Sequence, residues 1–124
     1  MIFVTHPDFA DHDTGVGHPE RPARLTAVAE GVRRSGLGGD LRPVAPEPAT
    51  VADLERVHDP GYVGALERFC RTGGGHLDAD TPCTPRSWDA ALLAAGAGLT
   101  AVRHLEAGEG DAAFCAVRPP GHHA

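Results

Sequence analysis

The sequence predicts an α/β fold in which helices cross over a mainly parallel sheet. Apolar runs suited to buried strands stand at residues 1–5 and 112–117, with a weaker strand candidate at residues 40–44. Segments with helical spacing of apolar residues separate these runs, in the order strand, helix, strand, three helices, strand. This alternation favours parallel strands joined by crossover helices.

Length and composition limit the classes of protein. The 124 residues fit one domain at most, and 41% hydrophobic with 23% charged residues is typical of a soluble globular chain. The net charge is −6 and all eleven basic residues are arginine, so the chain contains no Walker lysine and no lysine nucleophile. The acidic balance argues against a nucleic-acid partner. Without a secretory signal or an apolar run of roughly 18 residues, we expect a cytoplasmic protein with no membrane partner.

The first third of the chain alternates between regular and irregular segments. Residues 1–5 form the first predicted strand, and residues 6–20 form a polar loop whose glycines and prolines predict no regular structure. A helix begins at Pro22 and ends at Gly36. We expect its apolar stripe, formed by Leu25, Val28, Ala29 and Val32, to be buried on the sheet.

Capping signals place the next elements. Residues 40–44 form a short edge strand, because proline within it cannot donate to a central ladder. Thr50 and Asp53 form a capping box at the start of a short helix that runs through Val57. Asp59 followed by proline starts another helix. The apolar face of that helix is formed by Tyr62, Val63, Leu66 and Phe69.

The longest helix precedes the last strand. Residues 72–82 form a flexible loop, since its three glycines have neither the strand nor the lysine of a phosphate cradle. Thr84 followed by proline starts the long helix, and Gly96 and Gly98 allow close approach of a neighbouring segment. The glycines at 108 and 110 end it. We expect a buried stripe formed by Leu92, Ala95, Leu99, Val102 and Leu105.

Two histidines follow the last strand in the stretch Arg-Pro-Pro-Gly-His-His-Ala at 118–124. The prolines stop the strand, so His122 and His123 lie just past its carboxyl end, where open α/β sheets bind ligands. Three interpretations remain open from these residues alone: an exposed chain end, a metal site, or general acid–base chemistry at neutral pH. Gly121 allows the sharp bend that brings both rings to one pocket.

Other candidate ligands are scattered. The acidic and histidine-rich loop at 6–20 matches no recognised metal-ligand spacing, so a solvated loop or an active-site rim is favoured over a metal loop. The three cysteines are far apart, and none belongs to a Cys-x-x-Cys pair. We expect free thiols rather than a zinc cluster or a nucleophile. These cysteines are Cys70, Cys83 and Cys115.

Four segments together resemble the zinc-dependent histone deacetylase family, which includes the bacterial acetylpolyamine amidohydrolases. Residues 118–124 resemble the paired-histidine motif in the Pro-Pro-Gly form of the bacterial and class II branches. Residues 17–25, Gly-His-Pro-Glu-Arg-Pro-Ala-Arg-Leu, resemble the family's first loop and helix start. Residues 57–63 resemble its His-x-x-x-Tyr segment, and residues 78–82 followed by 90–98 resemble the loop and alanine-rich helix before the motif.

The resemblance implies an arginase/deacetylase-like three-layer α/β fold and hydrolysis of an acetylated amine, either acetyl-lysine or an acetylated polyamine. It implies that His123 is the general base and that His122 assists electrostatically or as the acid. It places Gly121 at the turn, Asp80 where a loop aspartate grips the substrate backbone, and Arg24 where some members have an arginine lining an internal channel. Zn²⁺ is the implied cofactor of the intact enzyme.

The family's zinc ligands, its histidine-partnering carboxylates and its catalytic tyrosine follow the paired histidines, and none matches a residue of this chain. We therefore expect residues 1–124 to be the N-terminal part of a single deacetylase domain, truncated after the paired histidines and inactive alone. The alternative is a non-catalytic binding or assembly fragment. In either case, an unpaired strand edge and uncovered apolar faces favour association into oligomers.

Overall fold

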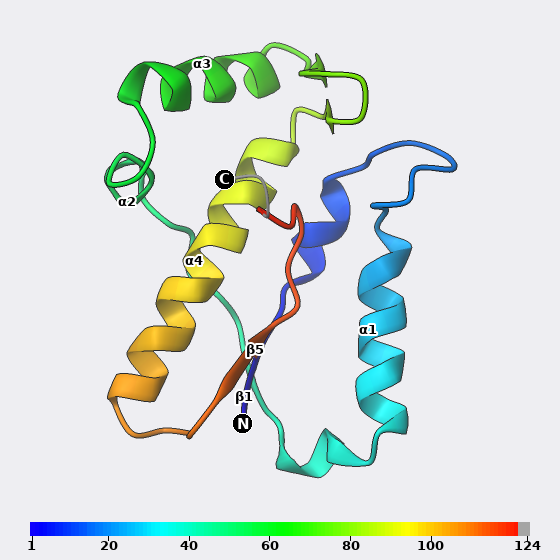
Figure 1. Cartoon of the computed structure of the whole chain (residues 1–124), viewed down its shortest axis with the longest axis vertical. Helices are drawn as coiled ribbons and strands as arrows, with labels where there is room; N and C mark the ends of the chain where they lie inside the picture. Colours follow the sequence, from blue (N-terminus) through cyan, green and yellow to red (C-terminus); the bar gives the residue numbers. More distant parts are fainter. Residues whose placement is uncertain (122–124) are drawn as a thin grey trace.

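The computed structural model describes residues 1–121, and its elements follow the predicted order (Figure 1). One sheet contains β1 (Ile2–Val4), β2 (Arg42–Val44) and β5 (Ala113–Cys115), and a small hairpin contains β3 (Gly75–His76) and β4 (Pro82–Cys83). The α-helices are α1 (Ala23–Arg34), α2 (Val51–Leu54), α3 (Pro60–Arg71) and α4 (Ser87–Glu106). Two 3-10 helices, η1 (Pro7–Asp11) and η2 (Leu37–Asp40), complete the elements of residues 1–121.

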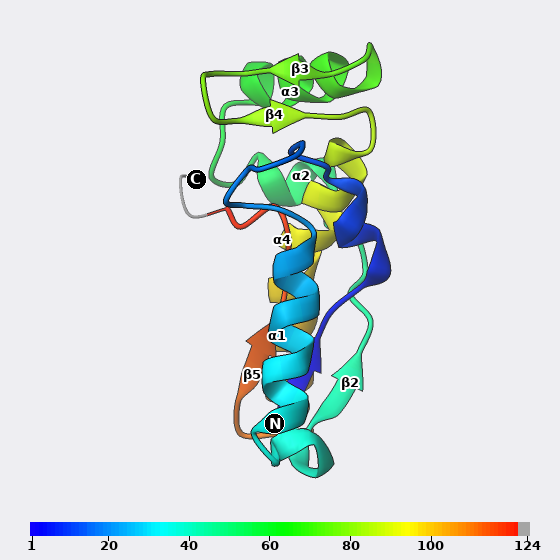
Figure 2. The ribbon, with the colours of Figure 1, turned by 90° about the vertical axis from the view of Figure 1, so that its right-hand side faces the viewer.

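The larger sheet confirms the predicted α/β fold. Its strand order is β2-β1-β5 and both pairings are parallel, with Phe3 opposite Pro43 on one side and Phe114 on the other. The proline strand β2 lies at an edge, as predicted. The sheet lies between α4 and α1, which run along its two faces (Figures 1 and 2). This arrangement makes three layers, and β5 forms the second edge of the sheet among the described residues.

The main core lies between the sheet and α4. Ile2 and Val4 are fully buried and pack against Ala97 and Ala101 of α4. Gly96 lets this helix approach the segment after β2, because a Cβ there would collide with the carbonyl oxygen of Glu47. The predicted close approach is therefore confirmed at Gly96. It is wrong at Gly98, where an added Cβ would meet nothing within 4 Å.

The predicted start and buried stripe of α4 are also wrong in detail. The helix begins at Ser87, whose hydroxyl accepts a hydrogen bond from the backbone N–H of Thr84 at 2.8 Å. Nearly every residue of α4 is small or apolar, so helical spacing alone does not select one stripe. The predicted Ala95, Leu99 and Val102 are exposed, and Leu92 and Leu105 are only partly buried. The buried positions include Trp88, Leu93, Ala97, Thr100 and Ala101.

Two segments expected to be irregular contain regular structure. The loop at 72–82 contains the β3–β4 hairpin, which packs near the second core formed by Trp88, Val63 and Cys70. The loop at 6–20 contains η1, whose start is capped by the ring of His6. Both elements are too short for the periodicity that reveals longer helices and strands.

The predicted helix caps are largely confirmed. Thr50 and Asp53 form the capping box of α2, and Asp59 caps α3 through a 3.1 Å hydrogen bond from the N–H of Tyr62. The short helix α2 ends at Leu54 rather than Val57. Tyr62 itself is 53% exposed, so it does not belong to the buried face of α3.

The helix α1 packs more loosely than predicted. It runs from Ala23 and is followed by Gly36 at φ 76°, close to the predicted bounds, yet none of its residues is buried. Leu25, Val28 and Val32 are half-buried and Ala29 is exposed. The expected burial of this stripe on the sheet is therefore wrong for residues 1–121. Within the same residues, no helix is long and apolar enough to cross a membrane.

Candidate functional site

The segment that leads to the paired histidines is anchored to β1. After β5, the N–H of Ala116 donates to the carbonyl of Val4 at 2.9 Å, and Thr5 Oγ1 donates to the carbonyl of Ala116 at 3.1 Å. Gly121 has φ +65°, a left-handed conformation that favours glycine. His122 and His123 themselves lie outside the described residues.

The side chain of Arg118 anchors this segment, and it is the largest fully buried side chain of residues 1–121. Its Nε and Nη2 donate to the two carboxylate oxygens of Glu20 at 2.7 and 2.6 Å. Its Nη1 donates to the carbonyls of His12 at 2.9 Å and Phe9 at 3.2 Å. A buried guanidinium needs this degree of pairing, because an unpaired charge is strongly unfavourable away from water.

Glu20 is the centre of the hydrogen-bond network around Arg118. Its carboxylate also accepts from Arg24 Nη1 at 3.1 Å, and its backbone carbonyl accepts from Arg118 Nη2 at 3.4 Å and from the hydroxyl of Thr14. Burial raises the pKa of Glu20, but the hydrogen bonds and charge of Arg118 outweigh it and hold this pKa below its usual range. The pair is therefore ionised at neutral pH.

His12 also lies next to the hydrogen-bond network around Arg118. Its Nδ1 lies 2.8 Å from Ser87 Oγ at the start of α4, and its Nε2 lies 4.0 Å from Glu20 Oε2. Burial first, and the charge of Arg118 second, lower the pKa of His12, so its ring is neutral at pH 7. This neutral ring joins the 6–20 loop to α4 without adding a second positive charge beside Arg118.

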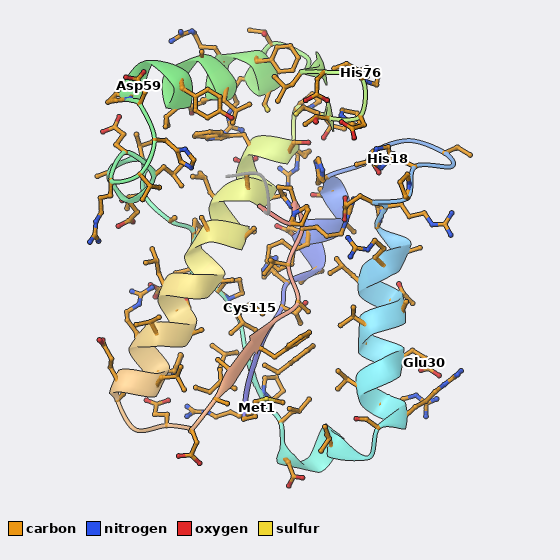
Figure 3. All side chains as sticks on the ribbon, viewed as in Figure 1. Met1, His18, Glu30, Asp59, His76 and Cys115 are labelled. Carbon is orange, nitrogen blue, oxygen red and sulfur yellow. The ribbon has the colours of Figure 1, made fainter. Side chains whose placement is uncertain are left out.

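The structure brings Asp80 and Arg24 near the same network from different sides. Asp80 lies in the exposed β3–β4 loop, where its backbone N–H donates to Asp78 Oδ1 at 3.0 Å, and its backbone carbonyl lies 3.1 Å from His18 Nε2. His18 lies between the hairpin and the start of α1 (Figure 3). Arg24 is half-exposed and contacts Glu20 on the first turn of α1.

The histidines of the 6–20 loop do not converge on one point. The Nδ1 of His6 accepts from the N–H of Asp8, whereas His12 and His18 contact Ser87 and Asp80. Across residues 1–121, no group of three or more His, Cys, Asp or Glu side chains is arranged to hold a metal ion. The three cysteines are free, and burial raises the pKa of each thiol, to about 11 for Cys83.

The sequence interpretation missed the pairing of Glu20 with Arg118. Both residues stand inside motifs that were recognised, but 98 positions separate them and nothing in either motif indicates the partner. The available signal was an arginine directly after a buried apolar run, where a charge requires a buried counter-charge.

Comparison with known protein families identifies the class to which this layered fold belongs. The histone deacetylase domain family matches residues 18–124, and the chain belongs to this family. The chain is 42% identical over its full length to an uncharacterized protein of Synechocystis, slr0245, and covers 41% of that protein. It is 37% identical, over 86% of its length, to a histone deacetylase-like amidohydrolase of Pseudomonas aeruginosa, of which it covers 28%.

A solved structure gives the same fold. The crystal structure of the HDA15 HD domain superposes on 99% of this chain with a TM-score of 0.89 and 30% sequence identity. The chain covers 36% of that structure. It therefore spans less than half the length of each of these proteins.

Proposed function

We propose that residues 1–124 form the N-terminal part of a hydrolase domain that removes acetyl groups from an acetylated amine. The family match across residues 18–124, which include the paired-histidine motif, carries this proposal. The substrate class implied by the resemblance is acetyl-lysine or an acetylated polyamine. The short coverage of the relatives supports a domain whose remaining parts lie beyond these residues.

In this proposal the two histidines move protons. His123 takes a proton from the water that attacks the acetamide carbonyl, and the departing amine receives a proton as the C–N bond breaks. His122 stabilises the charge that develops or supplies that proton. The products are acetate and the free amine. The left-handed Gly121 and the buried Arg118 support the segment that carries both rings.

Asp80 and Arg24 have binding roles in this proposal. Asp80 belongs to an exposed loop, and its position there is compatible with contact to the substrate backbone. Arg24 is held by an ion pair with Glu20, and this position is compatible with a role in lining a channel.

The described residues do not fit a zinc site. Among residues 1–121, no group of three or more His, Cys, Asp or Glu side chains could hold the ion. We propose that the Zn²⁺ ligands belong to the part of the domain that follows residue 124. The isolated chain is accordingly expected to bind zinc poorly and to lack turnover.

A chimera tests the proposal. Residues 1–124 replace the matching segment of the Pseudomonas aeruginosa amidohydrolase, and acetate release is measured with an acetyl-lysine peptide and with N-acetylputrescine. We expect turnover by the chimera, its loss on His123→Ala, and none by the isolated chain with or without Zn²⁺. A folded chimera without turnover refutes the catalytic role, and turnover by the isolated chain refutes its inactivity.

The alternative is a non-catalytic assembly fragment. The exposed edge of β5, with Phe114 at 44% exposure, favours it. A folded chain that associates stably, combined with an inactive but folded chimera, would support this alternative over the hydrolase.

A further inference from the structure

Glu20 connects two segments that the proposed function assigns to catalysis and substrate binding. We propose that Glu20 is a positioning residue for the deacetylation proposed above, holding the segment that leads to His122 and His123 in register with the Asp80 loop. The inference rests on that function for its catalytic consequence. Its structural part, a mechanical link between the two segments through Glu20, stands on contacts within residues 1–121.

The first link joins the side chain of Glu20 to Arg118. Two charge-assisted hydrogen bonds of 2.7 and 2.6 Å form a fork between the planar guanidinium and the carboxylate. The arginine side chain is 0% exposed and the glutamate side chain is 17% exposed, so water screens the pair weakly. Since His122 follows Arg118 by four positions, a shift of this pair moves the origin of the catalytic segment.

The second link joins the backbone of Glu20 to Asp80 through the ring of His18. The Nε2 of His18 lies 3.1 Å from the carbonyl oxygen of Asp80, and a carbonyl only accepts, so Nε2 carries the hydrogen. The Nδ1 of the same ring lies 3.1 Å from the backbone nitrogen of Glu20 and 2.9 Å from its carbonyl oxygen. One imidazole therefore bridges the backbones of Glu20 and Asp80.

The two links meet at one residue. The side chain of Glu20 holds Arg118, and its main chain holds His18, so displacement of Glu20 reaches both segments. Glu30 provides a matched comparison because it binds Arg33 with the same pair of distances, 2.7 and 2.6 Å. That pair lies on the exposed side of α1 and touches neither segment (Figure 3).

Backbone amide shifts of the 124-residue chain test the link directly. Glu20→Gln removes the charge while keeping the shape, and we expect it to shift the ¹H–¹⁵N signals of Arg118 and Gly121 and also those of residues 78–81. His18→Ala is expected to shift only residues 78–81. Glu30→Gln is expected to leave both segments unchanged.

Two results would overturn the inference. A folded Glu20→Gln variant that leaves the signals of either segment unchanged removes the link, as does an equal response to Glu30→Gln. If Glu20→Gln does not fold, Glu20→Asp replaces it, because this change retains the charge and shortens the side chain by one methylene. The amide signals of Arg118, Gly121 and residues 78–81 are then compared in the same way.

The catalytic consequence is measured in the chimera described above. We expect Glu20→Gln to lower kcat between about 10- and 100-fold with a smaller change in KM, since small misplacements of catalytic groups have effects of this size. Unchanged kcat in the folded variant contradicts the positioning role. An unmutated chimera without turnover refutes the proposed function, whereas the amide shifts still decide whether Glu20 links the two segments.

Discussion

The replacement Arg118→Met tests most directly how much the buried ion pair between Arg118 and Glu20 contributes to stability. Methionine fills part of the arginine volume but leaves the Glu20 carboxylate with Arg24 alone, and it leaves the carbonyls of Phe9 and His12 without the guanidinium. Removing one member of a buried ion pair costs about 3–5 kcal/mol, because the remaining charge stays desolvated. Native domains have a total stability of only about 5–15 kcal/mol, so this loss is large.

Urea unfolding followed by tryptophan fluorescence measures this loss. Trp88 is the only tryptophan and is 2% exposed, so its emission reports loss of the core beside α3. A loss of about 4 kcal/mol with an m-value of about 1.5 kcal/mol/M lowers the urea midpoint by about 2.7 M. If Arg118→Met has no folded baseline, Arg118→Lys replaces it in the test. Lysine keeps the charge but loses the two-pronged hydrogen bond, so we expect a urea midpoint between those of the wild type and Arg118→Met.

Arg33→Met is the matched control. Arg33 and Glu30 reproduce the two distances of the Arg118 and Glu20 pair, but the arginine side chain is 70% exposed instead of 0%. We expect no measurable change of midpoint, because exposed ion pairs contribute little. Equal midpoints for Arg118→Met and Arg33→Met would refute the assignment of stability to burial of the pair.

Three further results are expected. The pKa of Glu20 is lower in the folded chain than in the unfolded one, so its stabilising contribution is complete above about pH 4.3 and is lost as the pH falls through the folded value. Urea midpoints measured from pH 6 to 3 should therefore fall more steeply in the wild type than in Glu20→Gln, and parallel curves would contradict this. Gly96→Ala should destabilise the chain by about 1–3 kcal/mol through collision with the carbonyl of Glu47, while Gly98→Ala, with open space, should stabilise it by up to about 1 kcal/mol; thermal unfolding that reverses this order refutes the predicted packing. The chain should self-associate in sedimentation velocity through its exposed β5 edge, less so in Phe114→Lys, and a monodisperse wild-type monomer would count against this.

Local sequence signals predicted most of the fold. The apolar run at 1–5 became β1 with Ile2 and Val4 fully buried, and the Thr50 capping box and the Asp59 cap formed as predicted. These signals succeed because they act between residues at most four positions apart. The order of strands and helices then sufficed for a parallel α/β sheet.

Local sequence signals failed to predict which face of α4 is buried, because this depends on residues distant in the sequence. Helical spacing selected Ala95, Leu99 and Val102 as buried positions of α4, but the sheet packs against Ala97 and Ala101 instead. Beside these small side chains, Gly96 lets the helix approach the backbone of Glu47. When almost every residue of a helix is small or apolar, the spacing of apolar residues does not show which face of the helix is buried.

The amino-acid sequence by itself determined the class of fold and the resemblance that the family match confirmed, because both depend on the order of short motifs along the chain. Only the tertiary structure decided how these motifs support one another. The buried fork between Glu20 and Arg118 and the bridge from His18 to Asp80 join residues 98 and 62 positions apart. The fork exists because folding removes the Arg118 guanidinium from water and requires partners for it, and the chain order does not specify which distant residues become partners in either contact.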